Sequence, residues 1–169
     1  MFWLKRQKNK ETINEIKNGQ GVFSIWQYSP EEWKHAAENH FDFKLKNPQE
    51  VGKVCFTKRY ILAYDQQNDV LFELVGERRF TKHLTEVRLL KQSPMNNLRF
   101  EVRTKTIKKD DDGHDTMEED YGVETFYVPV PTGYQIEQEK VLKYYQDFLD
   151  KTADAIAAVM PFGLGMFRG

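Results

Sequence analysis

An apolar stripe near the end of the chain limits the fold more than any other feature of the sequence. From Ile136 onward, the stripe recurs at steps of three and four residues, the spacing of one face of an α-helix. Its positions are Val141, Tyr145, Phe148, Leu149, Thr152, Ile156 and Val159. Such a helix has to bury this face against a second layer of structure. Pro161 marks its expected end.

The second layer is predicted to be an antiparallel sheet. Residues 98–106 alternate between apolar or threonine side chains and charged ones, which indicates a strand with one face in water. Other extended segments lie at 22–27, 51–56, 60–64, 70–75, 84–90 and 123–130, giving about seven strands. Pro129 keeps the last of them out of a long central position. We therefore expect an α+β fold with a bent antiparallel sheet or a partly open barrel.

A short helix is predicted between the first two strands. Ser29 can cap its N-terminus, Pro30 suits its first position, and Glu32 completes a capping box. Tyr28 and Trp33 flank the box as a hydrophobic staple. An apolar stripe continues from Trp33 to Phe41, so the helix should end before Asn47-Pro48.

Composition points to one soluble domain. The 169 residues carry 25 Lys and Arg against 26 Asp and Glu, so bulk charge does not favour nucleic acid. One cysteine excludes an intrachain disulfide, and no apolar run approaches the ~20 residues of a membrane-spanning helix. We expect a basic arm at 1–20, one domain at 21–160 and an apolar, Gly-rich tail at 161–169. The expected location is the cytoplasm, with the membrane periphery as an alternative because both termini combine apolar and basic residues.

Three stretches together resemble bacterial proteins with a pleckstrin-homology-like (PH-like) domain. They are residues 26–33, with the pattern Trp-x-Tyr-Ser-Pro-Glu-Glu-Trp, residues 84–103, and residues 128–141, which begin Val-Pro-Val-Pro. The resemblance implies a bent antiparallel sheet, nearly closed into a barrel and plugged at one end by the C-terminal helix. It implies no particular reaction.

The acidic segment 110–120 is a weak candidate cation site. Placing Gly113 at position six of a calcium loop puts Asp110, Asp112 and Glu119 at ligand positions, but Lys108 then falls at position one and cannot ligate. A solvated hairpin tip is the preferred interpretation. Glu31, His35 and Glu38 share one helix face, a spacing that could present zinc ligands, although an exposed polar face explains it better.

The sequence favours binding over catalysis. It contains no Walker A loop, His-Glu-x-x-His, Cys-x-x-Cys or Gly-x-Ser-x-Gly motif, and Cys55 lies in a strand where a small buried side chain is expected. We expect a non-catalytic binding or scaffolding module with a protein or small-ligand partner, no nucleic acid and no cofactor. The candidate residues for an anionic ligand are Lys58, Arg59, Arg78, Arg79 and Lys82. The alternative is a helix-grip domain with an apolar ligand in a cavity between the sheet and helix 136–160.

Overall fold

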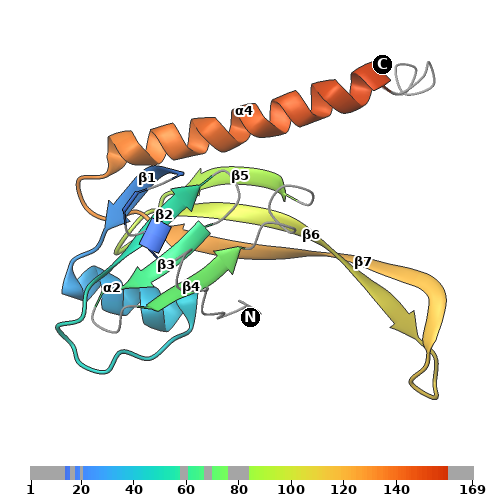
Figure 1. Ribbon diagram of the computed structural model, residues 1–169, viewed down its shortest axis with the longest axis horizontal. Helices are drawn as coiled ribbons and strands as arrows, with labels where there is room; N and C mark the ends of the chain where they lie inside the picture. Colours follow the sequence, from blue (N-terminus) through green and yellow to red (C-terminus); the bar gives the residue numbers. More distant parts are fainter. Residues whose placement is uncertain are drawn as a thin grey trace.

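The computed structural model describes residues 14–15, 18–19, 21–57, 61–66, 70–75 and 84–159. The elements in this part of the chain are shown in Figure 1. In chain order they are β1 (Val22–Gln27), α2 (Pro30–Ala36), the π-helical turn η1 (Ala37–Phe41), β2 (Gly52–Thr57), β3 (Ile61–Asp65), β4 (Val70–Val75), β5 (Leu84–Leu90), β6 (Asn97–Lys109), β7 (Asp115–Pro129) and α4 (Gln135–Val159). The predicted tail at 161–169 and most of the predicted arm at 1–20 lie outside the described residues.

The described strands form two antiparallel sheets. One has the order β1-β2-β3-β4 and the other β5-β6-β7, with each strand antiparallel to its neighbour. The predicted α+β class with antiparallel pairing is confirmed. The described strands do not close into a barrel. No helix in the described ranges is long and apolar enough to cross a membrane.

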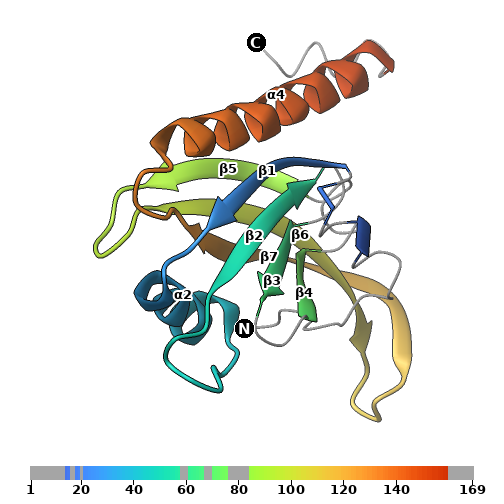
Figure 2. The ribbon, with the colours of Figure 1, turned by 60° about the vertical axis from the view of Figure 1, so that its left-hand side comes forward.

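Helix α4 lies across one end of both sheets. Figures 1 and 2 show it passing over β1 and β5, and it contacts both strands. Tyr145 is fully buried, and its hydroxyl donates a hydrogen bond to the Thr57 carbonyl at 3.2 Å. Its ring lies edge-on to Phe100 of β6, with centroids 5.6 Å apart. One helical side chain therefore contacts both sheets.

Aromatic rings make up much of the core between the sheets. Trp26 and Phe56 lie 4.5 Å apart between ring centroids in the first sheet. Phe100 and Phe126 stack at 4.7 Å in the second. All four side chains are buried, which keeps their apolar area out of water.

The hairpin of β6 and β7 is longer than predicted. Strand β7 begins at Asp115 and pairs with β6 as far out as Lys109, whereas the sequence suggested a strand starting only at Val123. The prediction was wrong there because Glu118, Glu119 and Asp120 have low strand propensity. Glu119 and Asp120 lie opposite Ile107 and Thr106 in the register, and Glu118 forms an ion pair of 3.5 Å with Lys108, a cross-strand contact that favours the longer pairing.

The capping box at the start of α2 is confirmed. The Glu32 N–H donates to Ser29 Oγ at 3.2 Å, and the Ser29 N–H donates to Glu32 Oε1 at 3.0 Å. The α-helix ends at Ala36, earlier than the apolar stripe suggested, and the π-helical turn η1 follows. Asp42 then adopts a left-handed conformation with φ of 53°, which turns the chain away from the helix.

Trp33 fixes the position of α2 on the first sheet. Its ring is buried and lies directly over Gly52 at the start of β2, where a Cβ atom would come within 2.2 Å of the ring. Only glycine leaves room for this approach.

Replacing Gly52 with alanine should therefore destabilise the protein. We expect G52A to lose about 2 to 3 kcal/mol of unfolding free energy in urea, because overpacking forces the indole or the strand to move. The control is Lys53→Ala on the next residue, which removes an ammonium group 5.3 Å from the Tyr64 ring centroid and should cost less than about 1 kcal/mol. Equal stability of G52A and wild type would show that Trp33 does not constrain this position.

Glu32 also connects α2 to the turn before α4. Its Oε2 accepts a hydrogen bond from the Thr132 N–H at 2.8 Å. Burial raises the pKa of this carboxyl, but the hydrogen bonds from Ser29 and Thr132 outweigh burial and leave the pKa below its ordinary value of 4.5.

This lowered pKa predicts a pH-dependent contribution to stability. The contribution is present above the ordinary value of 4.5 and is lost as the pH falls through the lower folded-state pKa. We expect Glu32→Gln to cost about 1 kcal/mol at neutral pH, a typical value for a helix cap. Thermal unfolding from pH 7 downward should show the gap between wild type and E32Q closing in acid. A gap that stays constant with pH would contradict the assignment.

Candidate binding groove

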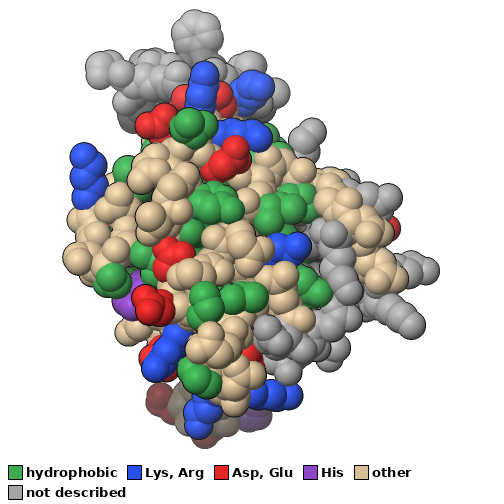
Figure 3. Space-filling view, turned by 90° about the vertical axis from the view of Figure 1, so that its left-hand side faces the viewer, with side chains coloured by type: hydrophobic (Ala, Val, Ile, Leu, Met, Phe, Trp, Pro, Cys, Tyr) green, Lys and Arg blue, Asp and Glu red, His purple; other side chains and the backbone are tan. Residues whose placement is uncertain are grey.

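A groove of about 750 Å³ lies beside α2 and η1. Its walls are the last turn of α2 with η1 on one side and the segment leading to β2 on the other. The lining residues are Lys34, Ala37, Glu38, Asp42, Phe43, Lys44, Leu45, Lys46, Asn47 and Pro48. Figure 3 views the molecule from the side that carries α2, where hydrophobic side chains are exposed among charged ones.

The apolar lining of the groove rests on the aromatic core around Trp33. Phe43 is half-buried, with its ring centroid 5.5 Å from that of Trp33 and 6.2 Å from that of Phe41. The Phe43 N–H donates to the Ala37 carbonyl at 3.1 Å. These contacts fix the position of Phe43 and preform the apolar lining.

The opposite wall is held by a buried carboxylate. Glu50 is 1% exposed, and its Oε1 accepts hydrogen bonds from the backbone N–H groups of Lys46 at 2.8 Å and Asn47 at 3.1 Å. Asn47 Oδ1 in turn accepts from the Gln49 N–H at 2.8 Å. Because one carboxylate oxygen accepts from two successive backbone N–H groups, the backbone at Lys46 and Asn47 is held in one conformation.

The second oxygen of Glu50 has no hydrogen-bond partner in the part of the chain that the structure describes. Oε2 is buried and unpaired among the described residues. A buried carboxylate oxygen without a donor costs free energy, so the two bonds to Oε1 have to outweigh that cost. The chain therefore carries an energetic penalty to hold the Lys46-Asn47 wall in place.

The rim of the groove carries an excess of positive charge. Lys34, Lys44 and Lys46 are exposed there, against the exposed carboxylates Glu38 and Asp42. A ligand with an apolar group for the floor and an anionic group for the lysines would match both features.

Two histidines lie close together on α2 and η1. His35 and His40 have ring centroids 5.5 Å apart, and His40 also lies 6.0 Å from the Tyr127 ring. Burial, with a smaller effect of His35, holds the pKa of His40 below its ordinary value. His35 Nδ1 lies 3.2 Å from Asn39 Nδ2. The predicted helix-face set of Glu31, His35 and Glu38 is not among the described groups whose ligand atoms converge.

The predicted anion-binding set is not tested by the structure. Lys58, Arg59, Arg78, Arg79 and Lys82 all lie outside the described residues. The terminal segments suggested for membrane contact also lie almost entirely outside them, so both ideas stay predictions.

The predicted cation ligands are only partly brought together. Asp110, Asp112 and His114 place ligand atoms within 4.8 Å of one another, but Glu119 is not in this group and accepts a hydrogen bond from the Tyr121 hydroxyl. Asp110 Oδ1 already accepts from the N–H groups of Asp112 at 3.0 Å and His114 at 2.9 Å. These bonds stabilise the hairpin turn, so the acidic tip has a structural explanation.

Cys55 is held as a thiol inside the first sheet. It is fully buried, and burial raises its pKa to about 11 despite the nearby charge of Lys53. The nucleophilic thiolate is therefore scarce at neutral pH.

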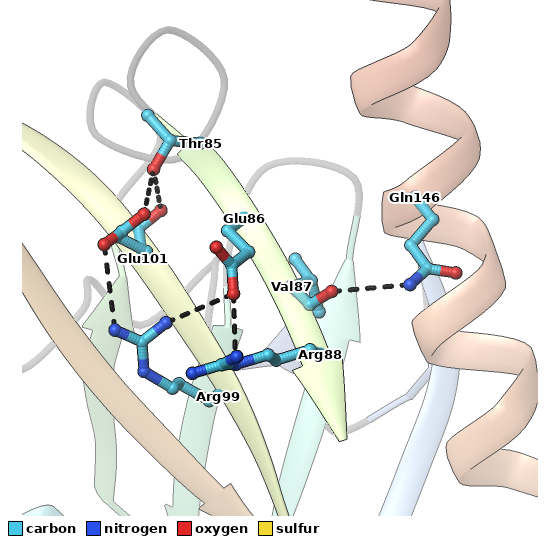
Figure 4. Close-up of polar contacts among 7 residues, drawn as sticks. All are labelled: Thr85, Glu86, Val87, Arg88, Arg99, Glu101 and Gln146. Carbon is cyan, nitrogen blue, oxygen red and sulfur yellow. Dashed lines mark hydrogen bonds and ion pairs between the residues drawn. The ribbon is translucent and has the colours of Figure 1, made fainter. Parts of the chain in front are cut away.

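A charged network covers the outer face of β5 and β6 (Figure 4). Arg99 contacts Glu86 at 3.4 Å and Glu101 at 3.7 Å, and Glu86 also contacts Arg88 at 3.1 Å. Thr85 Oγ1 donates to Glu101 Oε2 at 3.0 Å. These carboxylates are paired with guanidinium groups, as expected for the wet face predicted from the alternating residues of β6.

Sequence reasoning did not find the groove. Two of its three lysines, Lys44 and Lys46, lie in a segment that has neither helical nor strand periodicity, and the residue that holds this segment is Glu50 outside it. Asn47-Pro48 signalled a turn but gave no information about what the turn faces.

Comparison with family models, curated proteins and solved structures finds no match to this chain.

Removing the Glu50 carboxylate should loosen the groove wall. We expect Glu50→Ala to speed hydrogen exchange at the Lys46 and Asn47 amides at least about tenfold and to cost about 1 to 3 kcal/mol of stability, because two backbone donors lose their acceptor. Glu50→Gln keeps an acceptor oxygen and should have a smaller effect. Gln49→Ala, on an exposed neighbour, is the control. Unchanged exchange in E50A would show that the wall is held by other contacts.

Proposed function

We propose that this chain is a non-catalytic binding module with a PH-like architecture, and that the groove is its binding site. The architecture is supported by a four-stranded and a three-stranded antiparallel sheet whose shared end is covered by α4. The preformed groove, with an apolar floor and a basic rim, is the observation that carries the proposed function.

The helix-grip alternative is less well supported. It requires a cavity between the sheet and the final helix, whereas aromatic side chains are in contact there. Phe23 of β1 lies 4.3 Å from the Tyr144 ring and 5.7 Å from the Tyr145 ring of α4, measured between centroids. Rings at these separations are in van der Waals contact and favour a filled interior.

The titratable groups of the core also support binding over catalysis. Burial raises the pKa of Tyr28, Cys55 and Tyr145, so these groups stay protonated at neutral pH. Tyr28 donates its proton in a hydrogen bond to the Pro129 carbonyl, and Tyr145 donates to Thr57. Their hydroxyls are used to hold the fold.

The ligand class follows from the lining. The three lysines suit carboxylate groups, and the exposed edges of Phe43, Leu45 and Pro48 suit one apolar side chain. We propose an acidic peptide segment that carries one aromatic or aliphatic residue. Mixed apolar and polar contacts of this kind are typical of ligand sites.

Titration with designed peptides tests this function. The probe is a set of eight-residue peptides, each with four Asp or Glu residues around one Phe or Leu, and the readout is the amide chemical shift of the full chain. We expect shifts concentrated at residues 34–48 and weak affinity, with Kd of about 10 to 100 μM. Peptides in which Asn and Gln replace Asp and Glu should bind at least about tenfold more weakly, and the affinity should fall with added salt.

Two lysine variants separate this site from general charge attraction. The variant K34A/K44A/K46A should abolish the shifts, while K91A/K143A/K151A, which removes the same charge from exposed positions elsewhere, should retain them. Equal losses in both variants, or shifts outside the groove, would count against the groove as the site.

A further inference from the structure

Two histidines connect the groove wall to the second sheet. His35 lies in the last turn of α2 and His40 in η1, and both side chains are half-buried. Their rings meet edge-on, with centroids 5.5 Å apart and planes at 68°. The His40 ring also lies 6.0 Å from the Tyr127 ring of β7, again between centroids. His40 therefore contacts a ring on α2 and a ring on the second sheet.

The turn that carries His40 also forms one wall of the groove. Ala37 and Glu38 belong to η1 and line the groove, and Asp42 and Phe43 follow directly. The Ala37 carbonyl accepts hydrogen bonds from the N–H groups of Asp42 and Phe43. The other side of this turn contacts β7. Since η1 has only five residues, moving His40 away from β7 also moves the groove wall.

The charged groups near the pair on the helical side are carboxylates in water. Glu31 lies four residues before His35 and Glu38 three residues after it, and both are exposed. The Asn39 side chain contacts His35 at 3.2 Å. In the described part of the chain, neither His35 nor His40 forms an ion pair with a carboxylate. A positive charge on the pair is therefore not neutralised by a direct partner.

The charged groups on the sheet side do not neutralise the pair either. β7 presents the Tyr127 ring to His40. The register partner of Tyr127 on β6 is Arg99, which is itself cationic. The neighbouring carboxylates Glu86 and Glu101 already contact the Arg99 guanidinium at 3.4 and 3.7 Å.

Protonation changes the contact between the two rings. Two imidazolium rings at this separation repel each other, and the repulsion is stronger where the rings are partly shielded from water. Burial, followed by the effect of His35, already holds the pKa of His40 below its ordinary value of 6.5. The stabilisation from neutral His40 is therefore fully present above pH 6.5 and is lost as the pH falls through the lower folded-state pKa.

We infer that the His35–His40 pair is a pH switch that holds η1 against β7 at neutral pH and releases this wall of the groove in mild acid. Contacts between histidines of two packed elements respond to pH in this range. The effect on a ligand rests on the proposed function. Neither histidine lines the groove, so losing the fixed wall outweighs the attraction of the new charges for an acidic peptide.

Hydrogen exchange of the full chain, without a peptide, tests the switch. From about pH 7.5 to about pH 5.5, the protection factors of the Asp42 and Phe43 amides should fall at least about tenfold, because η1 opens. The Trp33 amide, which donates to the Ser29 carbonyl at 2.8 Å in the first turn of α2, should keep its protection. Constant protection of Asp42 and Phe43 across this range overturns the inference.

Variants assign the change to the histidine pair. His40→Phe keeps a ring beside Tyr127 without a titratable nitrogen, so its protection should not change with pH. His35→Gln should reduce the change at least about threefold, because it removes the second charge. His114→Gln, in the exposed hairpin turn, is the control and should behave as wild type. Wild-type pH dependence in both H40F and H35Q overturns the inference. Circular dichroism melting shows whether each variant is folded.

Binding of the acidic peptides at the same two pH values tests the coupling to the groove. Both values lie above the ordinary pKa of Asp and Glu, so the charge of the peptide stays nearly constant. Wild-type affinity should fall at least about fivefold at the lower pH, and H40F should change less than about twofold. Tighter binding in acid overturns the coupling. Exchange that depends on pH without peptide binding rejects the proposed function and supports the switch, whereas binding without a change in exchange does the reverse.

Discussion

The contact of Tyr145 with both sheets is the interaction on which the rest of the structure depends. The two described sheets share no strand, so their relative position has to come from side chains between them. Tyr145 donates to the backbone of β2 at Thr57 and packs on Phe100 of β6. Burial of a hydroxyl is tolerated there because it finds an acceptor. Helix α4 therefore determines the relative position of the two sheets. That position in turn determines where the ends of their strands lie.

The placement of α2 depends on that arrangement. Tyr28 precedes the helix and donates to the carbonyl of Pro129 at the end of β7, while Glu32 accepts from the Thr132 N–H just before α4. The N-terminus of α2 is thus joined to the second sheet while Trp33 packs on Gly52 of the first. The groove is formed where the chain leaves α2 and returns to β2. Its geometry follows from these long-range contacts, although its lining is local in sequence.

These contacts explain which parts of the molecule could be predicted from sequence. The capping box is encoded within four residues, Ser29 to Glu32, and was found. The strand alternation of β6 at Leu98, Phe100 and Val102 was also readable, because these side chains face the core. The groove was not predicted because it needs Glu50 to satisfy two backbone donors and Trp33 to meet a glycine nineteen residues away. Pairing beyond Val123 was missed because the acidic stretch of β7 has low strand propensity, and its partners, such as Ile107 opposite Glu119, are set by the register of the hairpin.

The outer edges of the second sheet are covered near the body of the molecule. An exposed strand edge is a template for unwanted pairing, and proteins cover such edges. Gln146 of α4 donates to the Val87 carbonyl at 3.4 Å, so the helix occupies the open side of β5 (Figure 4). Near the body, η1 contacts β7, with His40 beside Tyr127. Both of these contacts lie in the body of the molecule, close to the core. On the side of the molecule away from α2, residues 103–123 of the β6–β7 hairpin extend past them as a two-stranded ribbon, because the pairing of β5 with β6 ends at Val102 (Figure 1).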